Sequence, residues 1–390
     1  MAQPPGFVDS IYSSSVCKLH KSLYGLKQAP RAWNERFTNF LPSLGLQTTY
    51  ADTSLFVKHT ESGVVILLLY VDDIIIRMSA TTIISEVISA LATEFDIKDL
   101  GSLHYFLGIQ ITQTAEGLFL SQHNYVNDLL TKTEMHQSKP CATPCLPHNR
   151  LLKDDGTPFD NPALYRSIVG ALQYLTFTRL DIAFFVHQVC QFMHCPMKSH
   201  YLAIKRILRY LKMTQHYGIQ YVKGELELNT FSDVDWAGDP NDRRSTTGFV
   251  VFLGTNPISW SSKKQNTVSR SSTEAEYRAI ATTATKIDWM KQILAFLQID
   301  ISIPSTMFCD NLSAIALTCN PVMHQRTKHI EIDVHFVRER IAKQLLHMEF
   351  VSSTKQFVDI LTKGLSAPLF HAHCCNLRLR DPPPELEGGC

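Results

Sequence analysis

The stretch VVILLLYVDDIII, residues 64–76, decides the fold of the first part of the chain. An apolar run at residues 64–71 ends at Asp72 and Asp73, and three isoleucines follow. Two β-branched runs around a two-residue break predict a hairpin with both carboxylates at its tip. If the tip is buried, the two charges need a cation, and a divalent metal ion is the natural one. An exposed turn is the alternative, because Asp is a common turn residue.

The composition around this stretch is that of a folded protein. A length of 390 residues, at about 150 residues per domain, predicts two or three domains. With 45% hydrophobic residues, 17 Gly and 18 Pro, disordered and collagen-like classes are excluded. The run at 64–71 is shorter than the roughly 20 residues of a membrane span, and the N-terminus MAQPPGFVDS lacks the pattern of a secretory signal. We expect an intracellular protein, cytoplasmic or nuclear and not secreted, with reduced cysteines and no membrane partner.

The net charge of the whole chain does not indicate a nucleic-acid partner. The chain has 37 Lys plus Arg against 36 Asp plus Glu, a net charge of +1. Such a partner must therefore be argued from local sites. One local feature is the basic stripe Lys205, Arg209 and Lys212 on a predicted helix. A solvated face is the simpler interpretation, and phosphate contact needs a nucleic-acid context.

The chain changes character at two places. Residues 139–162 concentrate Pro, Asp, Asn and Gly, which is typical of a surface linker. Residues 163–216 have helical periodicity, and Asn161 followed by Pro162 predicts the start of the first helix there. A softer boundary follows at residues 213–225, where the pattern becomes strand-like.

Strands and helices alternate after this second boundary. Residues 226–234, 248–253 and 257–261 predict three strands of an antiparallel meander. The remaining elements are expected to be a helix at 272–286, a strand at 306–310, helices at 312–317 and 327–341, a strand at 347–352 and a helix at 356–363. This order predicts an α/β domain.

Four acids lie at the ends of strands or on helices of this domain: Asp233, Glu276, Asp310 and Asp359. Cleaving a phosphodiester with two metal ions requires several carboxylates gathered from different elements. Two choices stay open at this point. Asp233 and Asp235 share one face of a strand, whereas Glu274 and Glu276 are about 200° apart on a helix, so only one of the two glutamates can face the site.

Several long motifs resemble the Pol polyprotein of copia-type LTR retrotransposons. YVDD at 70–73, KLHKSLYGLKQAPRAW at 18–33, SLF at 54–56 and GSLHYFLGIQI at 101–111 are similar to its reverse transcriptase. YRSIVGALQYLTFTRLDIAF and AIKRILRYLK, which begin at Tyr165 and Ala203, follow in the same order. SDVDWAGD, DRRSTTGF, SSTEAEY and CDN are similar to the RNase H at the end of that polyprotein.

For the first half, the resemblance implies a polymerase palm. Asp72 and Asp73 become metal-binding catalytic residues, and Lys27, Gln28 and Arg31 belong to the helix that positions template and nucleotide. The stripe Lys205, Arg209 and Lys212 becomes a thumb-side contact with the nucleic-acid backbone. The third polymerase aspartate of the family lies upstream of the motif PPGFVD, which here occupies residues 4–9. We therefore expect that the chain alone does not polymerise DNA.

For the second half, the resemblance implies two-metal hydrolysis of RNA in RNA–DNA hybrids. It selects Asp233 over Asp235 and Glu276 over Glu274 as catalytic, metal-binding residues beside Asp310 and Asp359. Mg²⁺ is the expected cofactor, two ions per site, with Mn²⁺ as an alternative. The loop before the last acid reads SSTKQ at 352–356 and lacks the histidine that many RNase H enzymes carry there, which predicts slower or metal-dependent turnover.

The predicted fold class is α/β (α+β), with a partial reverse-transcriptase palm and helical thumb or connection before an RNase H-like domain with a mixed sheet. The expected division is a partial reverse transcriptase at 1–138, a linker at 139–162, a helical thumb or connection at 163–216, RNase H at 217–375 and a tail at 376–390. Expected partners are an RNA–DNA hybrid or a template–primer, and other fragments of the polyprotein. The competing hypothesis is a non-catalytic remnant that only folds or binds nucleic acid.

Overall fold

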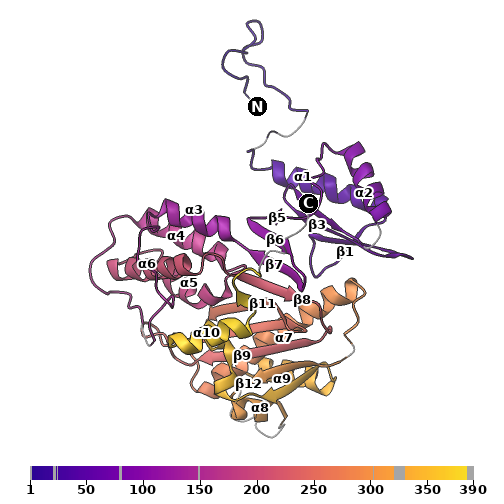
Figure 1. Ribbon diagram of the computed structural model, residues 1–390. Coiled ribbons are helices and arrows are strands. Elements are labelled where there is room, and N and C mark those ends of the chain that lie inside the picture. Colours follow the sequence, from indigo (N-terminus) through magenta and orange to yellow (C-terminus); the bar gives the residue numbers. More distant parts are fainter. Residues whose placement is uncertain are drawn as a thin grey trace. The chain divides into compact units, whose positions relative to one another are not determined.

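The computed structural model describes residues 2–20, 23, 25–78, 81–147, 150–301, 303–319 and 330–383. The chain divides into two compact units, one of residues 1–101 with 296–299 and one of residues 102–295 with 300–390 (Figure 1). Each unit combines helices with sheets, which confirms the predicted α/β class. Within the described part of the chain, no helix is both long and apolar enough to cross a membrane.

The first unit is a four-stranded antiparallel sheet covered by helices. Its elements are α1 Ala29–Phe40, η1 Leu41–Leu44, β1 Gln47–Thr48, β2 Leu55–Thr60, β3 Gly63–Tyr70, β4 Asp73–Arg77 and α2 Thr81–Glu94, with strand order β1-β2-β3-β4. The predicted hairpin is confirmed as β3 and β4. Val65 and Leu67 of β3 are fully buried and pack with Phe37 of α1 and Leu91 of α2, because alternate strand residues share one face.

The second unit begins with a five-stranded antiparallel sheet of order β14-β8-β7-β6-β5. Its strands are β5 Tyr105–Phe106, β6 Ile109–Gln113, β7 Gly117–Ser121, β8 Gly218–Val222 and β14 Leu379–Arg380. The predicted boundaries after residues 138, 216 and 375 stay predictions. Backbone pairing joins β7, β8 and β14 from three distant parts of the chain, and no local sequence pattern reports such pairing.

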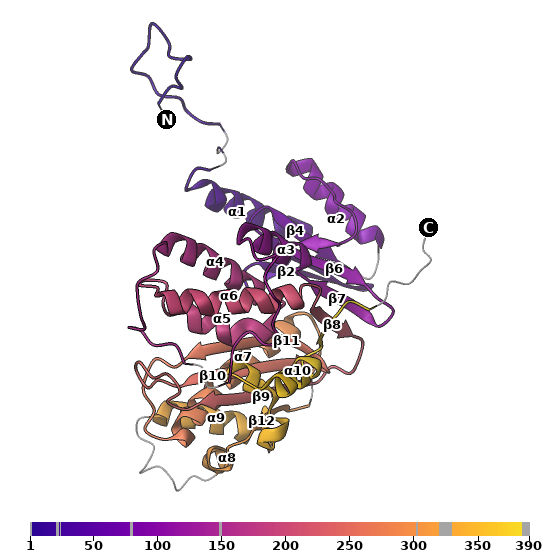
Figure 2. The same ribbon diagram turned by 60° about the vertical axis from the view of Figure 1, so that its left-hand side comes forward.

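The helices that follow β7 pack together (Figures 1 and 2), and α5 contacts α4, α6 and strand β11. They are α3 His123–Lys132, α4 Pro162–Leu175, η2 Leu180–Ile182, α5 Ala183–Cys190 and α6 Lys198–Met213. The predicted start of α4 is confirmed, because the Asn161 side chain accepts a hydrogen bond from the Leu164 amide. Arg179 and Asp181 form a fully buried ion pair at 2.7 Å, and the Tyr210 hydroxyl donates to the same carboxylate.

A mixed five-stranded sheet of order β11-β10-β9-β12-β13 forms the rest of the second unit. Its elements are β9 Leu228–Asp235, β10 Thr246–Leu253, β11 Asn256–Lys264, α7 Ser272–Phe296, β12 Ser305–Cys309, α8 Leu312–Cys319, α9 Glu331–Ala342, β13 Leu346–Phe350, η5 Ser353–Lys355, η6 Phe357–Leu361 and α10 Ala367–Asn376. Strands β9, β10 and β11 are antiparallel, as the meander predicts, while β12 is parallel to both β9 and β13. The mixed sheet is thereby confirmed.

Two of the predicted helices differ from the structure or lie partly outside the residues that it describes. The helix expected at residues 356–363 is wrong in type, because η6 is a 3₁₀ turn whose amides bond three residues back, Asp359 to Gln356 and Thr362 to Asp359. The helix expected from Thr327 is described only from Ile330 onward, because residues 320–329 lie outside the described residues. The last seven residues of the predicted tail, 384–390, lie outside them as well.

Candidate active site

The central strand β9 places the first acid of the site. Asp233 is 2% exposed and lies opposite Gly248 of the neighbouring strand β10. The hydroxyl of Thr362 donates a hydrogen bond to its carboxylate. Asp233 is therefore held on both sides, by the sheet through its backbone and by the segment after η6 through its side chain.

Gly248 allows η6 to pack directly on β10. A Cβ atom at this position would lie 2.6 Å from Cγ2 of Thr362, closer than real Cβ contacts, and 3.0 Å from Cβ of Leu361, which is tighter than most of them. At the start of the same turn, the Gln356 side chain donates to the Ser232 carbonyl at 2.9 Å. These contacts bring Asp359, in the middle of η6, over the strand that carries Asp233.

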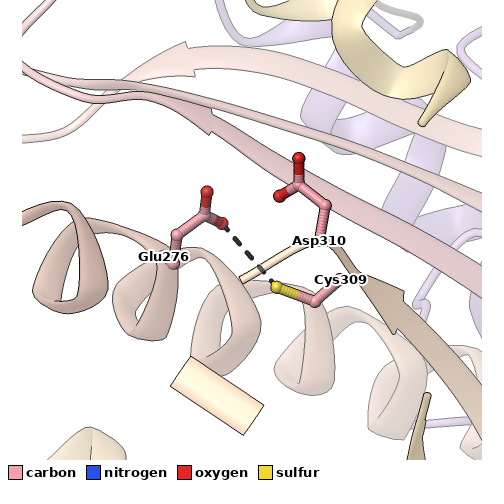
Figure 3. Close-up of side chains that lie close together, drawn as sticks. All are labelled: Glu276, Cys309 and Asp310. Carbon is pink, nitrogen blue, oxygen red and sulfur yellow. Dashed lines mark hydrogen bonds between the residues drawn. The ribbon is translucent and has the colours of Figure 1, made fainter. Parts of the chain in front are cut away.

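Glu276 and Asp310 approach the site from α7 and from the end of β12 (Figure 3). Glu276 is 6% exposed, and Asp310 is partly buried. Carboxylate oxygens of both residues and the Cys309 sulfur lie within 4.8 Å of one another, and the Cys309 thiol donates to Oε2 of Glu276 at 4.0 Å. Among the residues that the structure describes, this is the only group of three His, Cys, Asp or Glu ligand atoms gathered so closely.

The charges of these acids act on one another. Burial, and after it the charges of Asp233 and Asp310, raise the pKa of Glu276 to about 9. Burial and then the charge of Asp233 raise the pKa of Asp359 to about 7. The pKa of Asp233 is raised too, chiefly by its burial. The four acids therefore share one electrostatic environment, in which full ionisation is costly without added positive charge.

One cationic side chain already reaches this cluster. The Nζ atom of Lys363 lies 2.9 Å from Oδ1 of Asp359 and 4.0 Å from Oδ2 of Asp233. Burial by itself would lower the pKa of Lys363, but the charges of Asp233 and Asp359 outweigh it and raise that pKa. The lysine therefore stays protonated and neutralises part of the cluster.

The alternative acids are engaged elsewhere. Asp235, two residues after Asp233, forms an ion pair with Arg150 at 2.7 Å. Glu274, on the first turn of α7, pairs with Arg278 at 3.0 Å and accepts a hydrogen bond from the Arg270 amide. The structure thus gathers Asp233 and Glu276 with Asp310 and Asp359, the set that the resemblance selects.

The donor set fits hard divalent cations. Four carboxylates from four elements offer only oxygen atoms, which Mg²⁺ and Mn²⁺ prefer. Cys309 adds a soft donor beside Glu276, but burial raises the pKa of this thiol, which keeps it protonated and a weak ligand in the absence of a soft metal. Asp233, Glu276, Asp310 and Asp359 are accordingly the residues that would hold the ions.

The segment before the last acid contributes a hydroxyl to the site. Ser353, the first residue of η5, donates a hydrogen bond to Oδ2 of Asp310 at 2.9 Å. Sequence reasoning missed this contact, and it also missed Gly248, Thr362 and Lys363. The motifs TTGF and ILTK contain three of these residues, but only the packing of η6 on β10 shows their purpose.

The Asp72–Asp73 pair has a different environment in the first unit. Val71, at the turn, has a φ of 52°, and its carbonyl accepts a hydrogen bond from Nε1 of Trp33 at 2.7 Å. Both aspartates are exposed at the tip. Of the two interpretations that the sequence left open, the structure has the exposed turn, because the turn extends past the core-facing residues of β3 and its charges are solvated by water. Metal binding by Asp72 and Asp73 stays a prediction.

The predicted nucleic-acid contacts divide into two groups. Lys27, Gln28 and Arg31 lie at the exposed start of α1, where Arg31 pairs with Glu35 at 2.9 Å. The stripe on α6 is partly used within the protein. Arg209 donates to the Lys139 carbonyl at 2.5 Å and Lys212 to the Ser138 carbonyl at 2.7 Å, so they fasten the start of the linker to the helix. Lys205 is exposed and lies over the Tyr201 ring.

Comparisons with known proteins identify relatives of the chain by sequence. Residues 1–147 match the family described as reverse transcriptase (RNA-dependent DNA polymerase). Over 98% of its length the chain is 46% identical to the retrovirus-related Pol polyprotein from transposon RE1 of Arabidopsis thaliana, and over its whole length 45% identical to that from transposon RE2. The chain spans 26% and 27% of the length of these two relatives. It also covers 94% of a Saccharomyces cerevisiae protein named for transposon Ty5-1, at 32% identity over 73% of this chain.

Solved structures show weaker similarity. A foamy viral protease–reverse transcriptase in complex with double-stranded DNA aligns with a TM-score of 0.45 and 13% identity, over 83% of this chain and 49% of its own. An N-terminal RNase H domain from Mycobacterium tuberculosis, fused to maltose-binding protein, aligns with a TM-score of 0.27 and 13% identity, over 39% of this chain and 98% of its own. The family assignment follows from the sequence relatives alone: the chain belongs to the copia-type, retrovirus-related Pol polyproteins of transposons.

Proposed function

We propose that the second unit of this Pol polyprotein chain hydrolyses RNA in RNA–DNA hybrids with two Mg²⁺ ions. The observation that carries the proposal is the convergence of Asp233, Glu276, Asp310 and Asp359 from four separate elements. When bound, the metal ions would supply charge for the phosphodiester and a more acidic water. The protein supplies the ligands and, through Gly248 and η6, their fixed arrangement.

The burial of the cluster favours catalysis over a purely structural role. Three of the four acids are at most 6% exposed, and an isolated buried carboxylate costs a protein several kcal/mol of stability. Lys363 is the single lysine or arginine within 4.0 Å of these acids among the described residues. A set of buried acids with too little positive charge is typical of a metal site, where bound cations complete the neutralisation.

A cleavage assay tests this proposal. The whole chain is incubated with a labelled RNA–DNA hybrid and Mg²⁺, beside the variants D310N and D300N. Removing a metal ligand is expected to slow cleavage by more than about 100-fold, because even the outer partners of metal ligands commonly contribute 10- to 100-fold. Asp300 is exposed and provides the charge-matched control. No cleavage by the unmodified chain, or equal cleavage by D310N, would favour the non-catalytic remnant.

The first unit is proposed not to extend a primer in this 390-residue chain. Asp72 and Asp73 are exposed, and in the described part of the chain no third acidic, His or Cys ligand lies close enough to complete a metal group with them. Two-metal polymerisation requires such a set. Template-directed incorporation of nucleotides by the purified chain, lost in D72N, would contradict this.

A further inference from the structure

The four-acid site has two unequal sides. On one side, Asp233 and Asp359 share the ammonium of Lys363, at 4.0 Å and 2.9 Å. On the other side, Glu276 contacts the Cys309 thiol and Asp310 contacts the Ser353 hydroxyl, and both of these partners are neutral. Within the described residues, neither Glu276 nor Asp310 has a lysine or arginine nitrogen within 4.0 Å.

Lys363 is held at this position by its own backbone. Its amide donates to the Asp359 carbonyl at 3.0 Å, so it extends the turn that carries the acid with which it pairs. The preceding residue, Thr362, donates its hydroxyl to Asp233. The lysine side chain is 38% exposed, which leaves it a path toward solvent.

We propose that Lys363 is a positioning residue that acts as an internal counter-ion: its ammonium group occupies the cation position between Asp233 and Asp359 until a divalent ion displaces it. This inference rests on the proposed two-metal function. The first ion then binds on the Glu276–Asp310 side, where no described lysine or arginine nitrogen lies within 4.0 Å of either acid. The second ion binds more weakly, because it must move an ammonium group away from two carboxylates or tolerate its repulsion at short range.

The arrangement also has a consequence without metal. The single positive charge of Lys363 stabilises the folded cluster, because it offsets part of the repulsion among the buried acids. The same side chain is thus expected to stabilise the metal-free protein and to weaken binding of the second ion. A lysine that only packed against the turn would not produce these two opposite effects together.

Calorimetric titration of the whole chain with Mn²⁺ tests the proposal. The unmodified chain is expected to bind one ion tightly and a second more weakly. In K363M the second ion should bind about ten-fold more tightly, which corresponds to about 1.4 kcal/mol. K363R keeps the charge and should keep the weak second site. K355M removes a lysine from the neighbouring turn η5 and should leave both affinities unchanged.

Thermal unfolding provides the readout that needs no metal. In EDTA, K363M should unfold at a lower temperature than the unmodified chain, and saturating Mg²⁺ should raise its unfolding temperature by more than it raises that of the unmodified chain. If K363M does not fold without metal, K363Q, which keeps a polar side chain, is titrated instead.

The outcomes separate the two proposals. If the unmodified chain binds Mn²⁺ but the second ion binds K363M and K363Q no more tightly, the role of Lys363 is overturned while the two-metal function stands. The role is also overturned if K363R tightens the second ion as much as K363M does, because the effect then arises from packing and not from charge. If the unmodified chain binds no divalent ion, both proposals fail.

Discussion

The chain contains two sets of carboxylates that are candidate metal ligands, and the two sets differ in how they are assembled. Asp72 and Asp73 are neighbours in the sequence and lie exposed at the tip of a hairpin. Asp233, Glu276, Asp310 and Asp359 come from four elements and lie together, mostly buried, with a lysine beside them. The turn that carries Asp72 and Asp73 leaves both charges in water. The packing around the four-acid set removes most of its charges from water, so those charges need neutralisation.

The largest effect is expected on the rate of hybrid cleavage, when Asp233 of the four-acid set is replaced. D233N should slow hybrid cleavage by more than about 100-fold, because it removes a proposed metal ligand. The matched variant D235N, on the same strand and facing Arg150, should cleave within a few-fold of the unmodified rate. The measurement is the initial rate of hybrid cleavage under saturating Mg²⁺. Equal loss in both variants would show that the strand, and not the position of one acid, controls the rate.

Replacing Gly248 tests whether the close packing of η6 on β10 brings the four acids together. G248A places a Cβ atom 2.6 Å from Thr362 and so moves η6 away from β10. Overpacking of this kind costs about 1–3 kcal/mol, and cleavage should fall together with the free energy of unfolding. The control is G170A on α4, where a Cβ atom meets nothing within 4 Å and alanine should stabilise the helix by up to about 1 kcal/mol. Urea denaturation measures both variants; wild-type stability in G248A would contradict the packing argument.

The pH dependence of metal-free stability tests the burial of the set. The folded-state pKa of Glu276 is raised from 4.5 to about 9, and that of Asp359 from 3.8 to about 7. Because both are raised, their contribution to stability is complete below their ordinary values and is lost as the pH rises through about 7 and about 9. In EDTA the unfolding temperature should therefore fall between pH 5 and pH 9, and Mg²⁺ should restore it at high pH.

The variant E276Q sharpens this test. A glutamine resembles the protonated acid at every pH, so the fall in unfolding temperature with pH should be smaller in E276Q than in the unmodified chain. E86Q, which changes an exposed glutamate of α2, should leave the fall unchanged. An identical pH profile for E276Q and the unmodified chain would show that Glu276 is not protonated in the folded protein.

The smallest effect is expected at the hairpin tip. Because Asp72 and Asp73 are exposed, the double variant D72N/D73N should change the free energy of unfolding by no more than about 0.5 kcal/mol, in either direction, with or without Mg²⁺. Hybrid cleavage should also stay unchanged. A Mg²⁺-dependent increase in unfolding temperature that disappears in this variant would instead reveal a second metal site.

Local patterns were good guides to local structure. The hairpin of β3 and β4, the meander of β9, β10 and β11 and the start of α4 after Asn161 depend on residue periodicity and capping, and the structure confirms them. The long-range sheet that joins β7, β8 and β14 could not be predicted in this way, because edge pairing leaves no periodic signal in any one strand.

The sequence by itself determined which residues are available for chemistry and, through the resemblance, which four acids belong together. The tertiary structure decided which carboxylates are buried, that Asp235 and Glu274 are engaged with arginines, and that Lys363 stands between Asp233 and Asp359. It did so because the sheet order and the close packing that Gly248 permits bring distant residues within range of each other's charges. The energy of a Coulombic interaction depends on the distance between the charges and on their solvent exposure, and neither quantity can be derived from the order of the residues alone.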